Sequence, residues 1–108
     1  MVARRLVDTS TDVLAAVVVD AAGNLVAASE DDPRRARELA DLARQLVERA
    51  DAASGGPAEQ IEVQALGGSV FAVRSPRHVL ACVTRRAALP ALVLYDLRHG
   101  LQELERAA

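Results

Sequence analysis

The hydrophobic pattern in the first third of the chain predicts a hairpin of two strands. Residues 13–19 read VLAAVVV, an unbroken apolar run rich in β-branched residues. Such a run is typical of a strand whose two faces are both covered. The segment 20–24 (DAAGN) supplies turn residues, and residues 25–28 then form a second strand antiparallel to the first. A strand covered on both faces requires a layer of structure on each side of the sheet.

A long amphipathic helix is predicted after this hairpin, from about Pro33 to Ala53. Asp32 is suited to cap the free amides at its start, and proline is favoured at the first helical position. Apolar residues recur at helical spacing along one side, and charged residues occupy the other. The apolar side comprises Ala36, Leu39, Ala40, Ala43, Leu46, Val47 and Ala50, and the charged side comprises Arg37, Asp41, Arg44, Glu48 and Asp51. The segment 54–57 (SGGP) ends this helix.

The second half of the chain predicts three more strands and a final helix. Segment 59–65 (EQIEVQA) alternates polar and apolar residues, which indicates a strand with one face in water. Short turns containing glycine or proline lead to strands at 70–73 and 78–84, so these three strands form a meander. The remaining residues predict a helix with a proline near its start. Gly100 lies within it and costs about 1 kcal/mol relative to alanine unless close packing compensates.

The order strand, strand, helix, three strands, helix predicts an α/β protein of the α+β type. We expect a five-stranded antiparallel sheet with helices on both faces. A chain of 108 residues is long enough for one such domain, spanning 1–108 with its core in 13–108. The segment 1–12 is short and rich in Thr and Ser near its end, so it is expected to form a short helical turn at best.

Composition excludes several classes of partner. Hydrophobic residues make up 51% of the chain and charged residues 26%, as in ordinary globular proteins. Aromatic residues make up only 2%, and the arginines are interleaved with acids at a net charge of -2, so no nucleic-acid surface is expected. The run 13–19 is much shorter than the roughly 20 residues needed to cross a bilayer. With a single cysteine and no apolar segment of the export type at its start, the protein is expected in the cytoplasm.

Catalytic, cofactor-binding and metal-binding sites are not expected. His78 and Cys82 fall on the same face of one predicted strand, but two candidate ligands do not make a metal site. Cys82 also lacks a recognisable base, so a buried, inert thiol is the favoured interpretation. The glycine pairs at 55–56 and 67–68 form no phosphate-binding motif. The sequence therefore favours a protein that is not an enzyme.

Two segments resemble the Roadblock (dynein light-chain) family. Residues 17–29 (VVVDAAGNLVAAS) are similar to the family's opening hairpin, and residues 86–92 (RAALPAL) to its entry into the last helix. The resemblance implies a profilin-like sandwich that forms a homodimer, or a heterodimer with a sister Roadblock-type chain. In such a dimer the third strands pair edge to edge and the crossover helices lie side by side. It also implies work with a small Ras-like GTPase, as an activator or platform. The family usually carries a full helix before the first strand, so the first helix is expected to be shortened.

The predicted third strand has physical reasons to pair with another copy. It contains neither proline nor lysine to block an edge, and at an edge it would carry unpaired backbone groups. The residues expected at this dimer edge are Gln60, Ile61, Glu62, Val63, Gln64 and Ala65. The alternative is a monomer whose edge is guarded by Glu59 and Glu62.

The expected partner-facing surface is the charged side of the crossover helix, with Arg37, Asp41, Arg44 and Glu48. The alternative is that these charges only solvate the helix. Two other functions remain open for the chain as a whole. One is a small-molecule sensor of the PAS, GAF or profilin-like kind, and the other is a structural subunit of a larger complex.

Overall fold

A computed structural model of the protein describes residues 2–107; Met1, Ala108 and the side chain of Ala65 lie outside the described part. The elements are α1 (Val2–Thr9), β1 (Val13–Asp20), β2 (Leu25–Ala28), α2 (Pro33–Ser54), β3 (Gln60–Ala65), β4 (Gly68–Arg74), β5 (His78–Thr84) and α3 (Pro90–Ala107). From β1 onward, this is the order that the sequence predicts.

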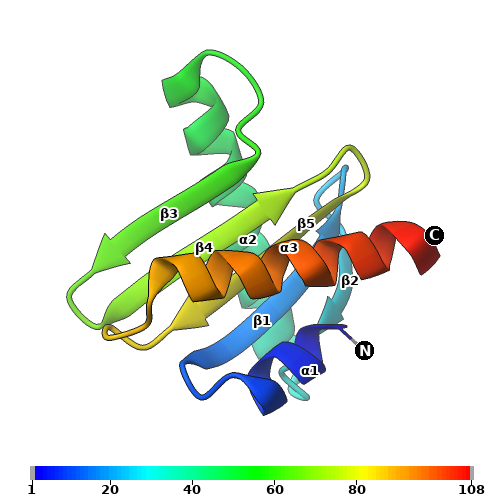
Figure 1. The fold of residues 1–108 in the computed structure, drawn as a ribbon. Coiled ribbons are helices and arrows are strands. Elements are labelled where there is room, and N and C mark those ends of the chain that lie inside the picture. Colours follow the sequence, from blue (N-terminus) through cyan, green and yellow to red (C-terminus); the bar gives the residue numbers. More distant parts are fainter. Residues whose placement is uncertain (1, 108) are drawn as a thin grey trace.

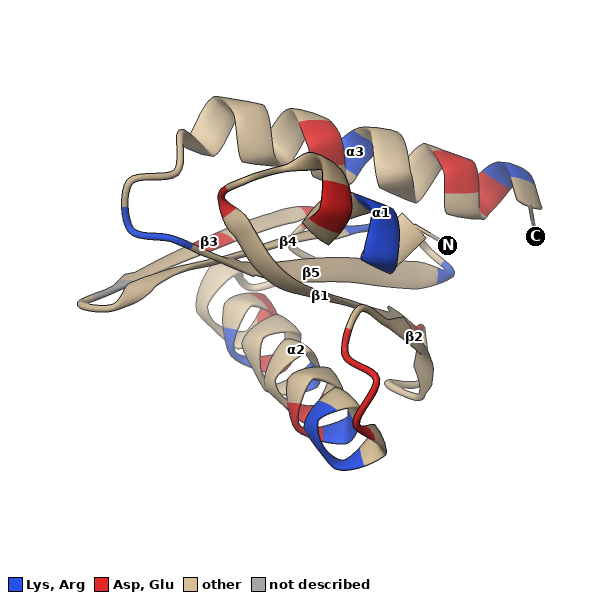
Figure 2. Ribbon diagram, turned by 90° about the horizontal axis from the view of Figure 1, so that it is seen from below, with Lys and Arg blue, Asp and Glu red and all other residues tan. Residues whose placement is uncertain are grey.

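The strands form one antiparallel sheet in the order β2-β1-β5-β4-β3. Helices α1 and α3 cover one face, and α2 covers the other (Figures 1 and 2). The predicted α+β class, with a five-stranded antiparallel sheet between helical layers, is thus confirmed. β3 to β5 form the expected meander, and α2 carries the chain from one edge of the sheet to the other.

Each face of the sheet has its own core. On the side of α1 and α3, Phe71, Leu80 and Leu97 are almost completely buried. On the side of α2, the core is built from smaller side chains: Val17, Val19, Ala40, Ala43, Ile61, Ala72, Val79 and Ala81. β1 contributes to both cores because successive side chains of a strand point to opposite faces. This explains why its apolar run does not alternate.

Local capping sets the limits of α2. Asp32 lies at its N-cap, where its carboxylate accepts a hydrogen bond from the backbone N–H of Arg34 at 3.0 Å. At the other end Gly55 adopts the left-handed region with φ 75°, and its N–H donates to the carbonyl of Asp51 at 3.0 Å. The helix therefore spans 22 residues, one more than predicted at its C-terminus.

The first helix is longer than predicted. A short helical turn at best was expected in residues 1–12, but α1 has eight residues and buries Ala3 and Leu6. A helix of this length is unstable in isolation, so its stability comes from packing on the sheet and α3. Ion pairs from Arg4 to Asp31 and from Arg5 to Glu103 add contacts between distant segments. Tertiary packing thus stabilises a helix that is too short to be stable in isolation.

Gly100 allows α1 and α3 to approach each other and the sheet. A Cβ atom at this position would lie 2.9 Å from Leu80 Cδ2 and 2.9 Å from Val2 Cγ1. Both distances are shorter than van der Waals contact. Close packing therefore compensates for the presence of a glycine inside α3.

Candidate protein-interaction surface

The first candidate surface is the free edge of β3, because the structure places β3 at one end of the sheet. The backbone N–H of Arg74 donates to the carbonyl of Glu59 at 2.9 Å. In an antiparallel pair, successive residues direct their N–H and C=O groups to opposite sides of the strand. Odd-numbered residues of β3 therefore bond to β4, and the even-numbered residues Gln60, Glu62 and Gln64 direct theirs outward.

The side chains of β3 alternate between the two faces of the sheet. Ile61 lies in the core beneath α2, and Val63, two residues further on, is 41% exposed on the same face. On the other face, Gln60 accepts a hydrogen bond from Arg98 of α3, and Gln64 donates to Glu62 at 3.1 Å. The edge thus has one apolar and one polar side.

Apolar side chains beside β3 extend this edge onto α2. Leu39 and Leu42 of α2 line a shallow crevice together with Val70 and Val83 of the sheet. Val70 is the cross-strand neighbour of Val63. Leu42 is 39% exposed, so the apolar surface continues from the strand edge onto the helix. The crevice measures about 10 Å³, which leaves no room for a ligand larger than water.

The second candidate surface is the charged side of α2, where Arg37, Asp41, Arg44 and Glu48 are all exposed. Of the two pairs spaced four residues apart, only Arg44 and Glu48 form an ion pair, with nitrogen and oxygen 3.0 Å apart. Pairs this exposed contribute little to stability, because water screens them. These charges therefore lie at the surface without being fixed by strong interactions within the chain.

Arg44 also packs over the β1–β2 turn. Gly23 in this turn has φ 87°, and a Cβ atom there would lie 2.9 Å from Arg44 Cδ. The turn is further held by Asp20, whose carboxylate accepts hydrogen bonds from the backbone N–H groups of Ala22 and Asn24, each at 2.9 Å. These bonds, with that from Asn24 the largest, hold the pKa of Asp20 below its usual range.

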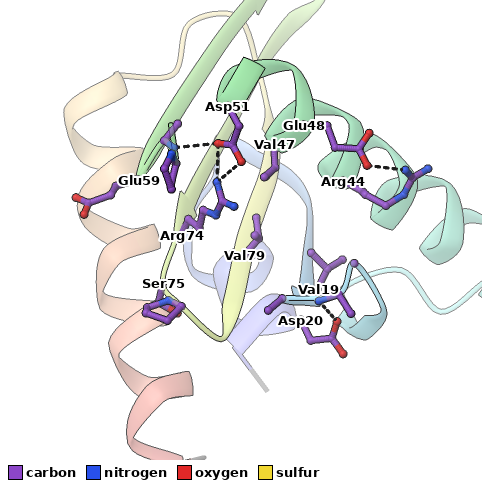
Figure 3. Close-up of a pocket in the computed structure, with 16 residues that line it drawn as sticks. Val19, Asp20, Arg44, Val47, Glu48, Asp51, Glu59, Arg74, Ser75 and Val79 are labelled. Atoms are coloured by element: carbon purple, nitrogen blue, oxygen red, sulfur yellow. Dashed lines mark hydrogen bonds and ion pairs between the residues drawn. The ribbon is translucent and has the colours of Figure 1, made fainter. Parts of the chain in front are cut away.

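A groove of about 500 Å³ opens between the C-terminal half of α2 and the end of the sheet (Figure 3). Val19, Val47 and Val79 line it, as do the turns that follow β1 and β4 and the segment that leads into β3. Its volume lies in the range of small-molecule sites. The groove could not be predicted from the sequence, because its walls come from segments far apart in the chain.

Two charged groups of the groove, Arg74 and Asp51, are already paired with each other. Arg74 Nη1 donates to both carboxylate oxygens of Asp51, at 2.6 and 2.8 Å. Asp51 also accepts from the backbone N–H of Ala58 at 2.9 Å. The hydrogen bond from Arg74 is the main reason why the pKa of Asp51 lies below its usual range. Figure 3 shows the carboxylate of Glu59 pointing away from this pair. The groove thus offers a ligand few unpaired polar groups.

His78 and Cys82 do not act together. His78 Nδ1 lies 3.3 Å from a carboxylate oxygen of Glu105, to which Ser75 also donates a hydrogen bond. The bond from Ser75 is the largest cause that lowers the pKa of Glu105. Cys82 is 2% exposed, and burial raises the pKa of its thiol to about 12. A thiol in this state is a packing group and not a nucleophile.

Within residues 2–107, no three His, Cys, Asp or Glu side chains are grouped closely enough to hold a metal ion. None of the helices in the same part of the chain is both long and apolar enough to span a bilayer.

Similarity to known proteins is found at the level of structure. No family model matches the sequence, and no curated protein matches it significantly. A Roadblock/LC7 domain from Streptomyces avermitilis superposes with a TM-score of 0.87 at 21% identity, covering 98% of this chain and 93% of that one. MglB from Myxococcus xanthus superposes with a TM-score of 0.73 at 16% identity, covering 98% and 90%.

The fold is that of a Roadblock/LC7 domain. Profilin from Schizosaccharomyces pombe has the related sandwich, with a TM-score of 0.61 at 17% identity, covering 97% of this chain and 98% of that one. The fold implied by the resemblance of residues 17–29 and 86–92 is thus confirmed. In this Roadblock/LC7 fold, β3 forms one edge of the sheet and α2 lies across the face next to it.

Proposed function

We propose that this chain is a non-enzymatic interaction module that dimerises through β3 and holds or regulates a small Ras-like GTPase. The observation that carries the proposal is the unpaired edge of β3 on a fold shared with MglB. A cytoplasmic location follows from such a role, because the partner is a cytoplasmic protein.

The case for dimerisation rests on the backbone of the edge. Gln60, Glu62 and Gln64 direct N–H and C=O groups outward, and none of these groups has a hydrogen-bond partner within residues 2–107. Lysine and proline, which commonly protect such an edge, are absent from β3. The alternative protection by Glu59 and Glu62 is weak, since only Glu62 belongs to the strand. A second copy would satisfy the free groups and cover Val63.

The case for a GTPase partner rests on α2. Arg37, Asp41, Arg44 and Glu48 present both signs of charge on one exposed helix face. Such a pattern suits recognition of a surface that carries complementary charges, and it contributes more to the rate and specificity of association than to affinity. The pairing of β3 leaves this outward face of α2 open to a partner.

A sensor of small molecules is the second candidate function, and the groove of about 500 Å³ favours it. Against it, Arg74 and Asp51, two part-buried charged groups of the groove, are already paired with each other. Thermal-shift measurements against nucleotides and metabolites separate the two functions. A bound small molecule would raise the melting temperature, whereas an interaction module would not respond.

The proposal is tested by adding the protein to a bacterial Ras-like GTPase loaded with GTP and measuring hydrolysis and co-elution. We expect a stable complex or a changed hydrolysis rate. The double charge reversal R37E/R44E should weaken the complex, because it reverses two charges on the docking face. Arg106→Glu, at the far end of α3, serves as the matched control. Neither co-elution nor a change in rate would contradict the role with the GTPase.

A further inference from the structure

We infer that two copies of this chain pair through β3 about a two-fold axis located at Glu62, so that the two Glu62 side chains oppose each other. The inference rests on the dimer proposed above and adds its register. Two observations carry it: which backbone groups the edge leaves free, and which side chains each possible register brings together.

The direction of the backbone groups limits the possible registers. In an antiparallel pair, opposed residues either exchange both of their hydrogen bonds or exchange none. The outward-directed residues Gln60, Glu62 and Gln64 must therefore oppose outward-directed residues of the second copy. In a pair of identical strands related by a two-fold axis, the residue numbers of any two opposed residues add up to the same total. This total is even here, because even-numbered residues oppose even-numbered residues. Near the middle of β3, the axis lies either at Glu62 or at Val63.

With the axis at Glu62, Gln60 opposes Gln64 of the second copy, and Glu62 opposes its own counterpart. All three outward-directed residues of each copy then exchange backbone hydrogen bonds, about six in total. On the other face, Ile61 opposes Val63 of the second copy and so covers part of Val63, which is 41% exposed in one chain. β-branched residues are favourable cross-strand neighbours.

With the axis at Val63, the bonding is poorer. Glu62 then opposes Gln64, but Gln60 opposes Leu66, which lies in the β3–β4 turn outside the strand. About four backbone hydrogen bonds remain. On the apolar face two pairs of Ile61 with Val63 are replaced by one Val63–Val63 pair and two pairs of Ile61 with Ala65 of the second copy, which are smaller.

One feature opposes the register at Glu62, namely the two facing carboxylates. Like charges directly opposite each other destabilise a strand pair. Glu62 is exposed, so water and salt weaken this repulsion. Two additional backbone hydrogen bonds and two Ile–Val contacts outweigh one screened pair of charges. The dimer therefore forms in this register, and the charge at position 62 limits its strength.

Disulfide cross-linking of Ile61→Cys and Val63→Cys distinguishes the two registers. Odd-numbered residues form the non-hydrogen-bonded pairs across the axis, where Cα atoms are about 4.5 Å apart and a disulfide is possible. We expect cross-linked dimer when the two variants are mixed and oxidised, and none with either variant alone. Cys82 does not interfere, because it is 2% exposed.

Each other outcome overturns the inference. Cross-linking of Val63→Cys alone would place the axis at Val63. A dimer in light scattering that gives no cross-link in any mixture would place the interface elsewhere, while leaving dimerisation intact. A protein that stays monomeric throughout would instead contradict the proposed function itself.

Because Ile61 is a core residue, two surface substitutions provide an independent test. Glu62→Gln removes the opposed charges and should lower the dissociation constant of the dimer by about two- to fivefold at low salt. Gln64→Glu should leave it nearly unchanged, because Gln64 opposes Gln60 of the second copy. Sedimentation velocity measures both constants. A weakened dimer in Gln64→Glu with no change in Glu62→Gln would show that Glu62 opposes Gln64 and would refute the inferred register.

Discussion

The guanidinium of Arg74 donates hydrogen bonds from Nη1 to both carboxylate oxygens of Asp51, at 2.6 and 2.8 Å. This pair joins the end of β4 to the last turns of α2. The same carboxylate holds the N–H of Ala58 just before β3 begins. The pair thus fixes how the crossover helix leads into the strand on which the proposed dimer depends.

Asp51→Asn is expected to lower the melting temperature at neutral pH. It should also make the melting temperature fall less steeply as the pH is lowered into the acidic range. Arg74 holds the pKa of Asp51 below its usual range, so the folded state favours the charged carboxylate. The stabilisation is fully present above the unfolded pKa of about 3.9 and is lost as pH falls through the lower pKa of the folded state. Thermal unfolding between pH 7 and pH 2 measures this. Asp41→Asn, on the exposed side of α2, is the control and should leave the profile unchanged.

Gly100→Ala is expected to destabilise the protein by roughly 1 kcal/mol. Overpacking costs about 1–3 kcal/mol, and the better helix propensity of alanine returns about 1 kcal/mol of it. The new methyl group would meet Leu80 Cδ2 and Val2 Cγ1, each at 2.9 Å. Urea unfolding provides the free energy of unfolding. Combining Gly100→Ala with Val2→Ala makes room beside α1 and should recover part of the lost stability. A Gly100→Ala protein that is more stable than the wild type would contradict the packing described here.

Cys82 is expected to be unreactive in the folded protein. Burial raises the pKa of its thiol to about 12, so the thiolate that reacts with disulfide reagents is scarce at pH 8. Ellman's reagent should detect the thiol in urea and not in native buffer. Rapid labelling of the native protein would show that the core around Phe71 and Leu97 opens readily.

Most of the fold could be predicted because its signals are local. The apolar run before Asp20, the cap at Asp32 and the alternation around Ile61 each fix one element through neighbouring residues. The helix α1 could not be predicted this way. With eight residues it is too short to be stable in isolation, and it is held by the packing of Ala3 and Leu6 on distant segments.

The surfaces were harder to predict than the elements. The segments that carry Asp51 and Arg74 are 23 residues apart, and neither local pattern indicates that the side chains meet. The composition of β3 indicated that it could pair, but its position at the edge depends on the strand order of the whole sheet. Which of its residues face outward is known only from the bond between Arg74 and Glu59.

The central claim is that the free edge of β3 pairs with a second copy, and the mass of the protein in solution tests it most directly. Light scattering at micromolar concentration should give twice the 11.4 kDa of one chain. Gln64→Pro should give a folded monomer, because the N–H that it removes points outward and the ladder to β4 stays intact. Val63→Pro, which breaks that ladder, should unfold the strand and serves as the comparison. A wild-type protein that is folded and has the mass of one chain would contradict the account.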